Sequence, residues 1–226
     1  MVERRSASCR RVRSFATSLL VICTLAACGT NAAKVEKPAG PIDRVAILRV
    51  ERADAAAQAA IADDSAQNPN PRLMSNAESV LTAQIYGVLA NDPHWRLAPD
   101  LEVDQAMRQV PIGGSLESRA QALGKATKTD AVVTGRISRF QERVGTDYGV
   151  RFPASVSFEL ELVQVSDGQV LWHGDFDRTQ KDLSSNLYDF WMFWRAGPHW
   201  FTAAELARLG VEELIEELDK GLAAQS

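Results

Sequence analysis

The stretch ASVSFELELVQVSDGQVLW, residues 154–172, is the part of the chain that decides the fold. In its first half, serine and glutamate alternate with the apolar residues Val156, Phe158, Leu160 and Leu162. This period of two is typical of a strand with one apolar face. The Ser166–Gly168 connection that follows is short and contains glycine, as hairpin turns do. Together with its flanks, the stretch predicts three consecutive antiparallel strands, at residues 130–143, 154–165 and 169–180.

The remaining patterns predict helices that pack on this sheet. Arg44–Val50 is an apolar, β-rich run that predicts a first, central strand. Ser75 with Glu78 is a capping-box pattern and opens an expected helix over residues 75–91, after a long connection at 52–72. The other expected elements are a short strand at 95–98, a helix capped by Asp100, a helix at 115–127, and a final helix opened by Thr202 and Glu205.

The fold class is therefore α/β in the broad α+β sense. We expect a mixed sheet with C-terminal antiparallel strands, helices packed on it, and a helical C-terminal extension. The chain is divided into a signal peptide at 1–27, a lipidated flexible tether at 28–41, an αβ domain at 42–182, and an aromatic-rich helical extension at 183–226 that packs on the domain.

The amino terminus has the layout of an export signal. Five arginines precede a 13-residue apolar run, Phe15–Ala27, which is shorter than the roughly 20 residues of a membrane-spanning helix. Leu25-Ala26-Ala27-Cys28 resembles the lipobox of bacterial lipoproteins. The resemblance implies cleavage before Cys28 and acylation of its thiol and new amine with fatty acids such as palmitate. Gly29, where retention at the inner membrane favours aspartate, implies the outer membrane. The alternative is an ordinary signal peptide that contains a cysteine.

Charge and cysteine content exclude several classes. Removing residues 1–27 takes away five arginines and one glutamate, which changes the formal charge from −4 to −8. Such an acidic domain is a poor candidate for nucleic acid or for anionic lipid headgroups. Cys9 and Cys23 leave with the signal and Cys28 is the lipidation site, so no disulfide is expected in the mature domain.

Three segments carry a family resemblance: Val45–Leu48, residues 123–135 and residues 160–172. They resemble the periplasmic lipoprotein domains related to the penicillin-binding-protein activator LpoB, the curli secretion lipoprotein CsgG and the amino-terminal domain of TolB. The resemblance covers roughly residues 42–180. Gly145–Pro153 is too short to supply the long hairpins of a secretion pore. The resemblance therefore implies a lipid-tethered sensor or adaptor domain.

Candidate catalytic groups are paired carboxylates on the predicted sheet. Asp175 and Asp177 share one strand face, as do Glu159 and Glu161, and such pairs could act on peptidoglycan sugars. The alternative, which we favour, is a solvated face balanced by Arg136, Arg139 or Arg178. The histidines His94, His173 and His199 lack metal-ligand spacing, and no nucleophile motif is present. We therefore expect no catalytic residue, no metal site and no cofactor.

The segment Leu187–Phe201 is unusually aromatic. Helical spacing assigns four of its residues to the core: Leu187, Phe190, Trp191 and Trp194. Tyr188, Phe193 and Trp200 point elsewhere and are candidate partner-binding residues.

These features predict a periplasm-facing, outer-membrane lipoprotein that is not an enzyme. It would act as an interaction or adaptor module in cell-envelope assembly, for example as an activator of a cell-wall synthase. The alternatives are an accessory of an envelope export system and a peptidoglycan hydrolase that uses Asp175 and Glu159. The expected partners are the membrane, through the lipid on Cys28, and an envelope protein; homo-oligomerisation stays open.

Overall fold

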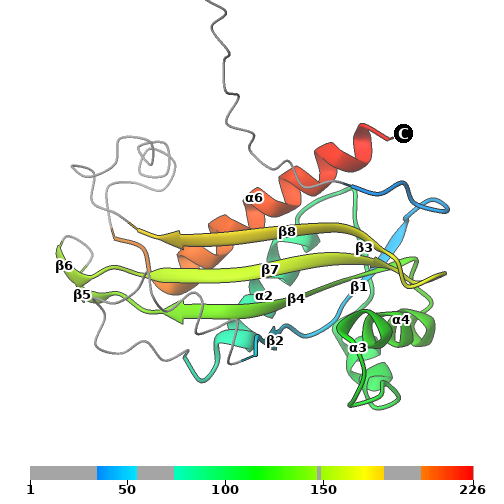
Figure 1. The fold of residues 1–226 in the computed structure, drawn as a ribbon, viewed down its shortest axis with the longest axis horizontal. Coiled ribbons are helices and arrows are strands. Elements are labelled where there is room, and N and C mark those ends of the chain that lie inside the picture. The colour runs from blue at the N-terminus through cyan, green and yellow to red at the C-terminus, as the bar shows by residue number, and fades with distance from the viewer. Residues whose placement is uncertain (1–34, 55–73, 147–148, 181–199, 226) are drawn as a thin grey trace, which may run out of the picture. The chain divides into compact units, whose positions relative to one another are not determined.

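The computed structural model describes residues 35–54, 74–146, 149–180 and 200–225. The elements, in chain order, are β1 (Arg44–Ile47), β2 (Glu51–Arg52), α2 (Ala77–Ala90), β3 (Arg96–Leu97), α3 (Asp100–Met107), α4 (Leu116–Thr127), β4 (Ala131–Gln141), β5 (Val144–Thr146), β6 (Gly149–Phe152), β7 (Ser155–Gln164), β8 (Val170–Thr179) and α6 (Ala203–Ala223) (Figure 1). The predicted α+β class with a mixed sheet is confirmed.

The main sheet has the order β3-β1-β4-β7-β8, and β2 pairs with β4 beside β1. β1 is parallel to both β3 and β4, whereas β4, β7 and β8 are antiparallel to one another. The three predicted consecutive strands are confirmed as β4, β7 and β8, with ends within two residues of those expected. β1 is an interior strand but not the central one, because it lies second from one edge and β4 lies in the middle of the order.

The predicted turn between β7 and β8 is also present. Gly168 N–H donates to the Gln164 carbonyl at 2.9 Å, and Gln169 N–H donates to Asp167 Oδ1 at 3.0 Å. Gly168 has φ of +79°, in the left-handed region that favours glycine. The residue types of this turn therefore match the backbone that it adopts.

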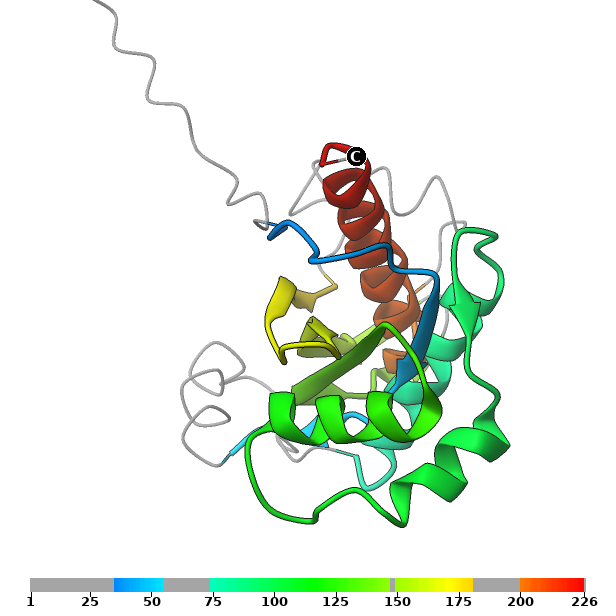
Figure 2. The same ribbon diagram turned by 90° about the vertical axis from the view of Figure 1, so that its right-hand side faces the viewer.

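One face of the sheet is covered by α2 and α6, and one end of the other face by α3 and α4. Figure 2 shows α6 and α4 on opposite sides of the strands. The apolar residues of β7 with even numbers and those of β4 with odd numbers up to Ile137 lie in the core with α2 and α6, as the strand period requires. After the register shift between Ile137 and Arg139, the even-numbered Phe140 joins the same core. The second, smaller core joins Ala46, Leu48, Val132, Val163 and Val165 to α3 and α4.

The predicted start of α2 is wrong. Ser75 and Glu78 form no capping box, because the helix begins at Ala77 with Asn76 as its N-cap and no side-chain cap bond. The Glu78 carboxylate instead accepts from Arg52 at 2.8 Å. The predicted cap at Asp100 is wrong as well, since Pro99 is the N-cap of α3 and Asp100 belongs to its first turn.

The predicted start of α6 is confirmed in full. The Thr202 hydroxyl accepts from Glu205 N–H at 3.2 Å, and the Glu205 carboxylate accepts from Thr202 N–H at 2.8 Å. Its apolar stripe, including Leu206, Leu214 and Leu218, is buried in the same core as β7 and β8. The division at residue 182/183 stays a prediction, because residues 181–199 lie outside the described part.

β5 and β6 form a small ladder that sequence analysis treated only as a connection. The expected helical turns within 52–72 lie outside the described residues. Among the helices that the structure describes, none is both long and apolar enough to cross a bilayer.

Candidate interaction surfaces

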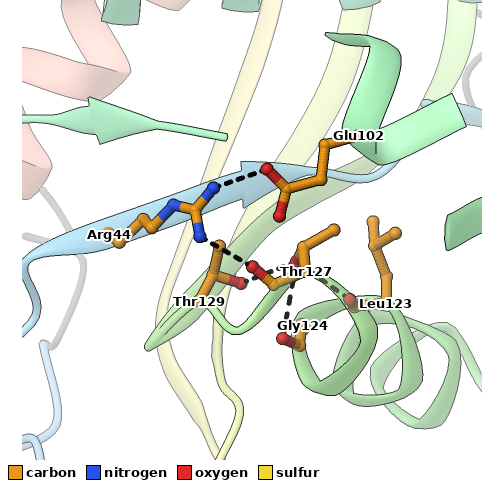
Figure 3. Close-up of polar contacts among 6 residues, drawn as sticks. All are labelled: Arg44, Glu102, Leu123, Gly124, Thr127 and Thr129. Carbon is orange, nitrogen blue, oxygen red and sulfur yellow. Dashed lines mark hydrogen bonds and ion pairs between the residues drawn. The ribbon is translucent and has the colours of Figure 1, made fainter. Parts of the chain in front are cut away.

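The residues that carry the family resemblance form a structural junction. Figure 3 shows Arg44 of β1 reaching Glu102 of α3 at 2.6 Å and the Thr127 carbonyl at 3.0 Å. The buried Thr127 hydroxyl donates to the Leu123 carbonyl at 2.9 Å and lies 3.2 Å from the Thr129 hydroxyl. These bonds join β1, α3 and α4 at the point where β4 begins. The polar groups of Thr127 and Thr129, in the resemblance segment 123–135, therefore make their hydrogen bonds inside the fold.

Lys128 and Asp130, in the same segment, also have structural roles. Lys128 ends α4 in the left-handed conformation, with φ of 52°. Asp130 Oδ2 accepts the N–H groups of Asp43 and Arg44, at 3.0 and 2.8 Å. Asp130 thus fixes the start of β1 against β4, which accounts for a carboxylate at this position.

The candidate catalytic carboxylates lie on the sheet face opposite α2 and α6. Arg136 donates to Glu159 at 2.9 Å, and Arg139 pairs with Asp177. Of the three arginines that the sequence suggested as partners of these carboxylates, Arg136 and Arg139 are therefore confirmed. Arg178 lies on the other face and pairs with Glu213 of α6 at 2.8 Å. Asp175, opposite Glu159 in the register, is exposed.

The expected solvated face is wrong for part of β7. Ser155, Ser157 and Glu161 are buried. β7 lies between β4 and β8, so its short or carboxylate side chains are flanked by long neighbours such as Arg136 and Arg139. Burial raises the pKa of Glu161, opposed by the charge of Arg136. The face is therefore a cross-strand network of ion pairs rather than a pair of free carboxylates.

His94 is not isolated in the fold. One carboxylate oxygen of Asp92, one of Asp219 and a ring nitrogen of His94 lie within 4.8 Å of one another. His94 Nδ1 is 2.8 Å from Asp92 Oδ1. Burial raises the pKa of Asp219 to about 6, aided by the hydrogen bond and charge of Asp92. Burial also acts to raise the pKa of Asp92, but hydrogen bonds from His94 outweigh it and lower that pKa. Sequence spacing missed this group because Asp219 comes from α6.

Trp95, which follows His94 in the chain, is held in place by a hydrogen bond to the third residue of the group. Trp95 Nε1–H donates to Asp219 Oδ1 at 3.1 Å, which fastens the α2–β3 turn to α6. The His94 ring is 79% exposed. This arrangement can share a proton between Asp92 and Asp219. His173 lies 3.6 Å from Glu161, and His199 falls outside the described residues.

A groove of about 670 Å³ lies between α2, α3 and the chain after β1. Ile47, Val50 and Val103 form its buried apolar floor. Burial and the nearby Asp100 carboxylate raise the pKa of Tyr86, so its phenol stays protonated. The volume suits a small molecule or a short peptide segment. No local sequence pattern predicts the groove, because its walls come from three separate elements.

The predicted flexible tether is wrong for its described part, residues 35–41. Val35 is only 8% exposed and packs on Gly221 of α6, where any Cβ would overlap its side chain. Glu36 N–H donates to the Leu171 carbonyl of β8 at 2.6 Å, and Ala39 N–H donates to Gln164 Oε1 at 3.2 Å. The Gln225 amide also bonds the Val35 carbonyl. This docked segment is held because the edge strand β8 offers a carbonyl and α6 offers a gap at glycine.

Trp200 lies at the opposite end of β8 and is half-buried. Phe201 beside it is 2% exposed, and its N–H donates to Gln180 Oε1 at 2.7 Å. Phe201 is thus a core residue that fixes the start of α6. Tyr188 and Phe193, the other candidate partner-binding residues, and the lipidation site Cys28 lie outside the described residues, so these assignments stay predictions.

No family model and no curated protein matches the chain. Solved structures of similar fold include the PelC dodecamer from Paraburkholderia phytofirmans, at 16% identity and a TM-score of 0.42 over 82% of this chain and 96% of that one. Lipoprotein GNA1162 from Neisseria meningitidis matches at 17% identity and a TM-score of 0.41, over 68% and 91%. The LpoB C-terminal domain from Salmonella enterica matches at 16% identity and a TM-score of 0.39, over 63% and 88%.

The LpoB group that the sequence resembles is thus found among the similar structures. The identities of 12–17% limit this similarity to the fold.

Proposed function

We propose that the chain is an outer-membrane lipoprotein that faces the periplasm and acts as a non-enzymatic interaction module in cell-envelope assembly. Activation of a cell-wall synthase is its most concrete form. The observation that carries the proposal is the docked segment, residues 35–41, which follows Cys28 by only a few residues. Fixing this segment to α6 and β8 gives the domain a defined point of attachment, which is of use when a lipid is attached upstream.

The polar face supports a non-enzymatic role. Glu159 and Asp177 are each engaged in an ion pair with an arginine from β4. A glycoside hydrolase needs one carboxyl that donates a proton and a second that is free to act on the sugar. A hollow of about 400 Å³ beside Glu159 is lined by Arg136 and Asp54 but not by Asp175.

The first experiment tests the anchor. Metabolic labelling with fatty acid should label the wild-type protein, and a Cys28→Ser variant should stay unlabelled and leave the membrane fraction. Equal labelling of both proteins, or an unlabelled wild type in the soluble fraction, would overturn the proposed anchor.

The second experiment tests the interaction. Cross-linking in envelopes followed by mass spectrometry should recover one envelope protein with wild type, and a Trp200→Ser variant should lose it while keeping its thermal melting. Ile112→Ser is the matched control, because Ile112 is an exposed apolar residue at 99% exposure on another surface. Recovery of export components would favour the export accessory. Muralytic activity that disappears in Asp175→Asn would replace the proposal with a hydrolase.

A further inference from the structure

The docked segment limits how far the domain can stand from its anchor. Val35 is seven positions after Cys28 in the chain, and an extended chain spans about 3.6 Å per position, so Val35 lies within about 25 Å of Cys28. A tether that stayed free as far as Ile42 would reach about 50 Å. Docking therefore halves the reach and fixes the place at which the chain leaves the domain. The argument rests on the proposed acylation of Cys28.

That place is at one end of the domain, which we call the tether end. The tether end comprises Val35, the turn at 166–168 between β7 and β8, the start of β4 and the C-terminal end of α6. The other end, the β5–β6 end, holds β5 and β6 (Figure 1). Trp200 belongs to this end, because its neighbour Phe201 bonds Gln180, which follows the last residue of β8. β7 alone has ten residues and so separates the two ends by about 33 Å.

The lysines of the described chain lie toward the tether end. The four lysines among the described residues are all exposed and all at the tether end: Lys37 in the docked segment, Lys125 and Lys128 at the end of α4, and Lys220 near the end of α6. Lys220 pairs with Glu216 at 2.7 Å. Within the described chain, Lys37, Lys125 and Lys128 have no ion pair, so their ammonium groups are available to an external anion.

We infer that the tether end is the surface that faces the lipid bilayer, with Lys37, Lys125 and Lys128 directed at headgroup phosphates. A domain that pivots about Val35 cannot enter the bilayer, so its opposite end lies farther out on average. The domain as a whole is acidic and does not favour an anionic surface, but exposed lysines that the tether holds close to such a surface are attracted to it. The β5–β6 end, with Trp200, is then presented to the periplasm and to the partner.

The test uses the thiol chemistry of the mature lipoprotein. With Cys28 acylated and the signal removed, an engineered cysteine is the only free thiol. Ser166→Cys at the tether end and Thr146→Cys on β5 are each labelled with a donor dye, and the acylated protein is reconstituted in phosphatidylethanolamine–phosphatidylglycerol vesicles that carry an acceptor lipid. Energy transfer is expected to be higher from position 166 than from position 146. Equal or reversed transfer overturns the inference.

The lysines are tested on the same vesicles. A variant with Lys37, Lys125 and Lys128 changed to glutamine should lose part of the transfer from position 166, and so should wild type in phosphatidylcholine vesicles or in high salt. Lys220→Gln is the matched control, because this lysine is already paired. A triple variant indistinguishable from wild type removes the lysine contact from the inference.

Mass spectrometry of Cys28 in the starting protein separates the proposed function from the proposed orientation. Absence of acylation rejects the proposed function, whereas an acylated protein without a difference in energy transfer rejects the orientation alone.

Discussion

Gly135, in the middle of β4, shows how a single missing side chain permits the strand pairing. A Cβ at this position would overlap the carbonyl oxygen of Glu159 on β7, which is backbone and cannot turn away. The register places Gly135 opposite Leu160, in the most buried part of the sheet. Small residues are therefore required here by packing and not by a ligand.

Replacing Gly135 by alanine should destabilise the fold by about 1–3 kcal/mol, the usual cost of overpacking a core. Gly87, in the exposed face of α2, is the matched control because a Cβ there meets nothing within 4 Å. Gly87→Ala should stabilise by about 0.5–1 kcal/mol through helix propensity. Chemical denaturation of both variants checks the prediction, and equal effects would contradict the packing argument.

Asp219 should make stability depend on pH. Its pKa is raised from 3.8 to about 6, so the folded chain holds this proton more tightly than the unfolded chain does. The stabilisation is complete below about pH 4 and is lost as the pH rises through about 6. An asparagine side chain in place of Asp219 would keep the acceptor for Trp95 and remove the charge that faces Asp92.

Asp219→Asn should therefore melt at a higher temperature than wild type above pH 6, with a flatter profile between pH 4 and 6. Thermal melting across pH 4 to 8 is the measurement. A variant that follows the wild-type profile throughout would show that Asp219 does not titrate in this range.

At the scale of the elements, α2 and α6 present the same N-terminal pattern with different outcomes. Thr202 and Glu205 form both bonds of a capping box, whereas Ser75 and Glu78 form neither. Arg52 of β2 binds the Glu78 carboxylate, so a tertiary ion pair takes the group that the local motif needs.

Thr202→Ala should cost about 1 kcal/mol, because α6 loses a cap whose hydroxyl accepts from Glu205 N–H. Ser75→Ala should change stability by less than about 0.5 kcal/mol, as expected for an exposed residue without such a bond. Urea denaturation of the two variants compares them directly. If Ser75→Ala lost as much stability as Thr202→Ala, the result would indicate that Ser75 does cap α2.

For the whole molecule, the docked segment joins the amino-terminal part of the chain to α6 and the edge of β8. Its contacts link residues that are far apart in the sequence, Val35 with Gly221 and Gln225, and Glu36 with Leu171. The segment covers β8 at an edge that would otherwise present free backbone groups.

A Gly221→Ala variant should displace Val35 and release the docked segment. In hydrogen-exchange mass spectrometry, the amides of Glu36 and Ala39 are expected to be protected in wild type and to exchange faster in Gly221→Ala. The rest of α6 should keep its protection, since alanine favours helix. Gly87→Ala serves again as the control. Unchanged exchange at Glu36 would show that Gly221 is not what admits Val35.

Local patterns predicted local structure well. The alternation in β7, the Ser166–Gly168 turn and the Thr202 cap each depend on residues within a few positions of one another, and each is found as expected. Predictions that assumed no tertiary competitor were wrong, namely the cap at Ser75, the free tether at 35–41 and the solvated face of β7. Asp92, His94 and Asp219 could not be joined from the sequence, because no spacing rule connects residues so far apart in the chain.

The sequence by itself determined the strand pattern and the mixed sheet with its covering helices, because periodicity and short motifs are properties of neighbouring residues. The lipidation signal at Leu-Ala-Ala-Cys stays a prediction from the sequence. Only the tertiary structure decided that residues 35–41 lie on α6 and β8, that arginines of β4 pair with Glu159 and Asp177, and that the exposed lysines of the described chain gather at one end. Those outcomes follow from which distant surfaces meet, and burial and charge pairing act only once the surfaces are in contact.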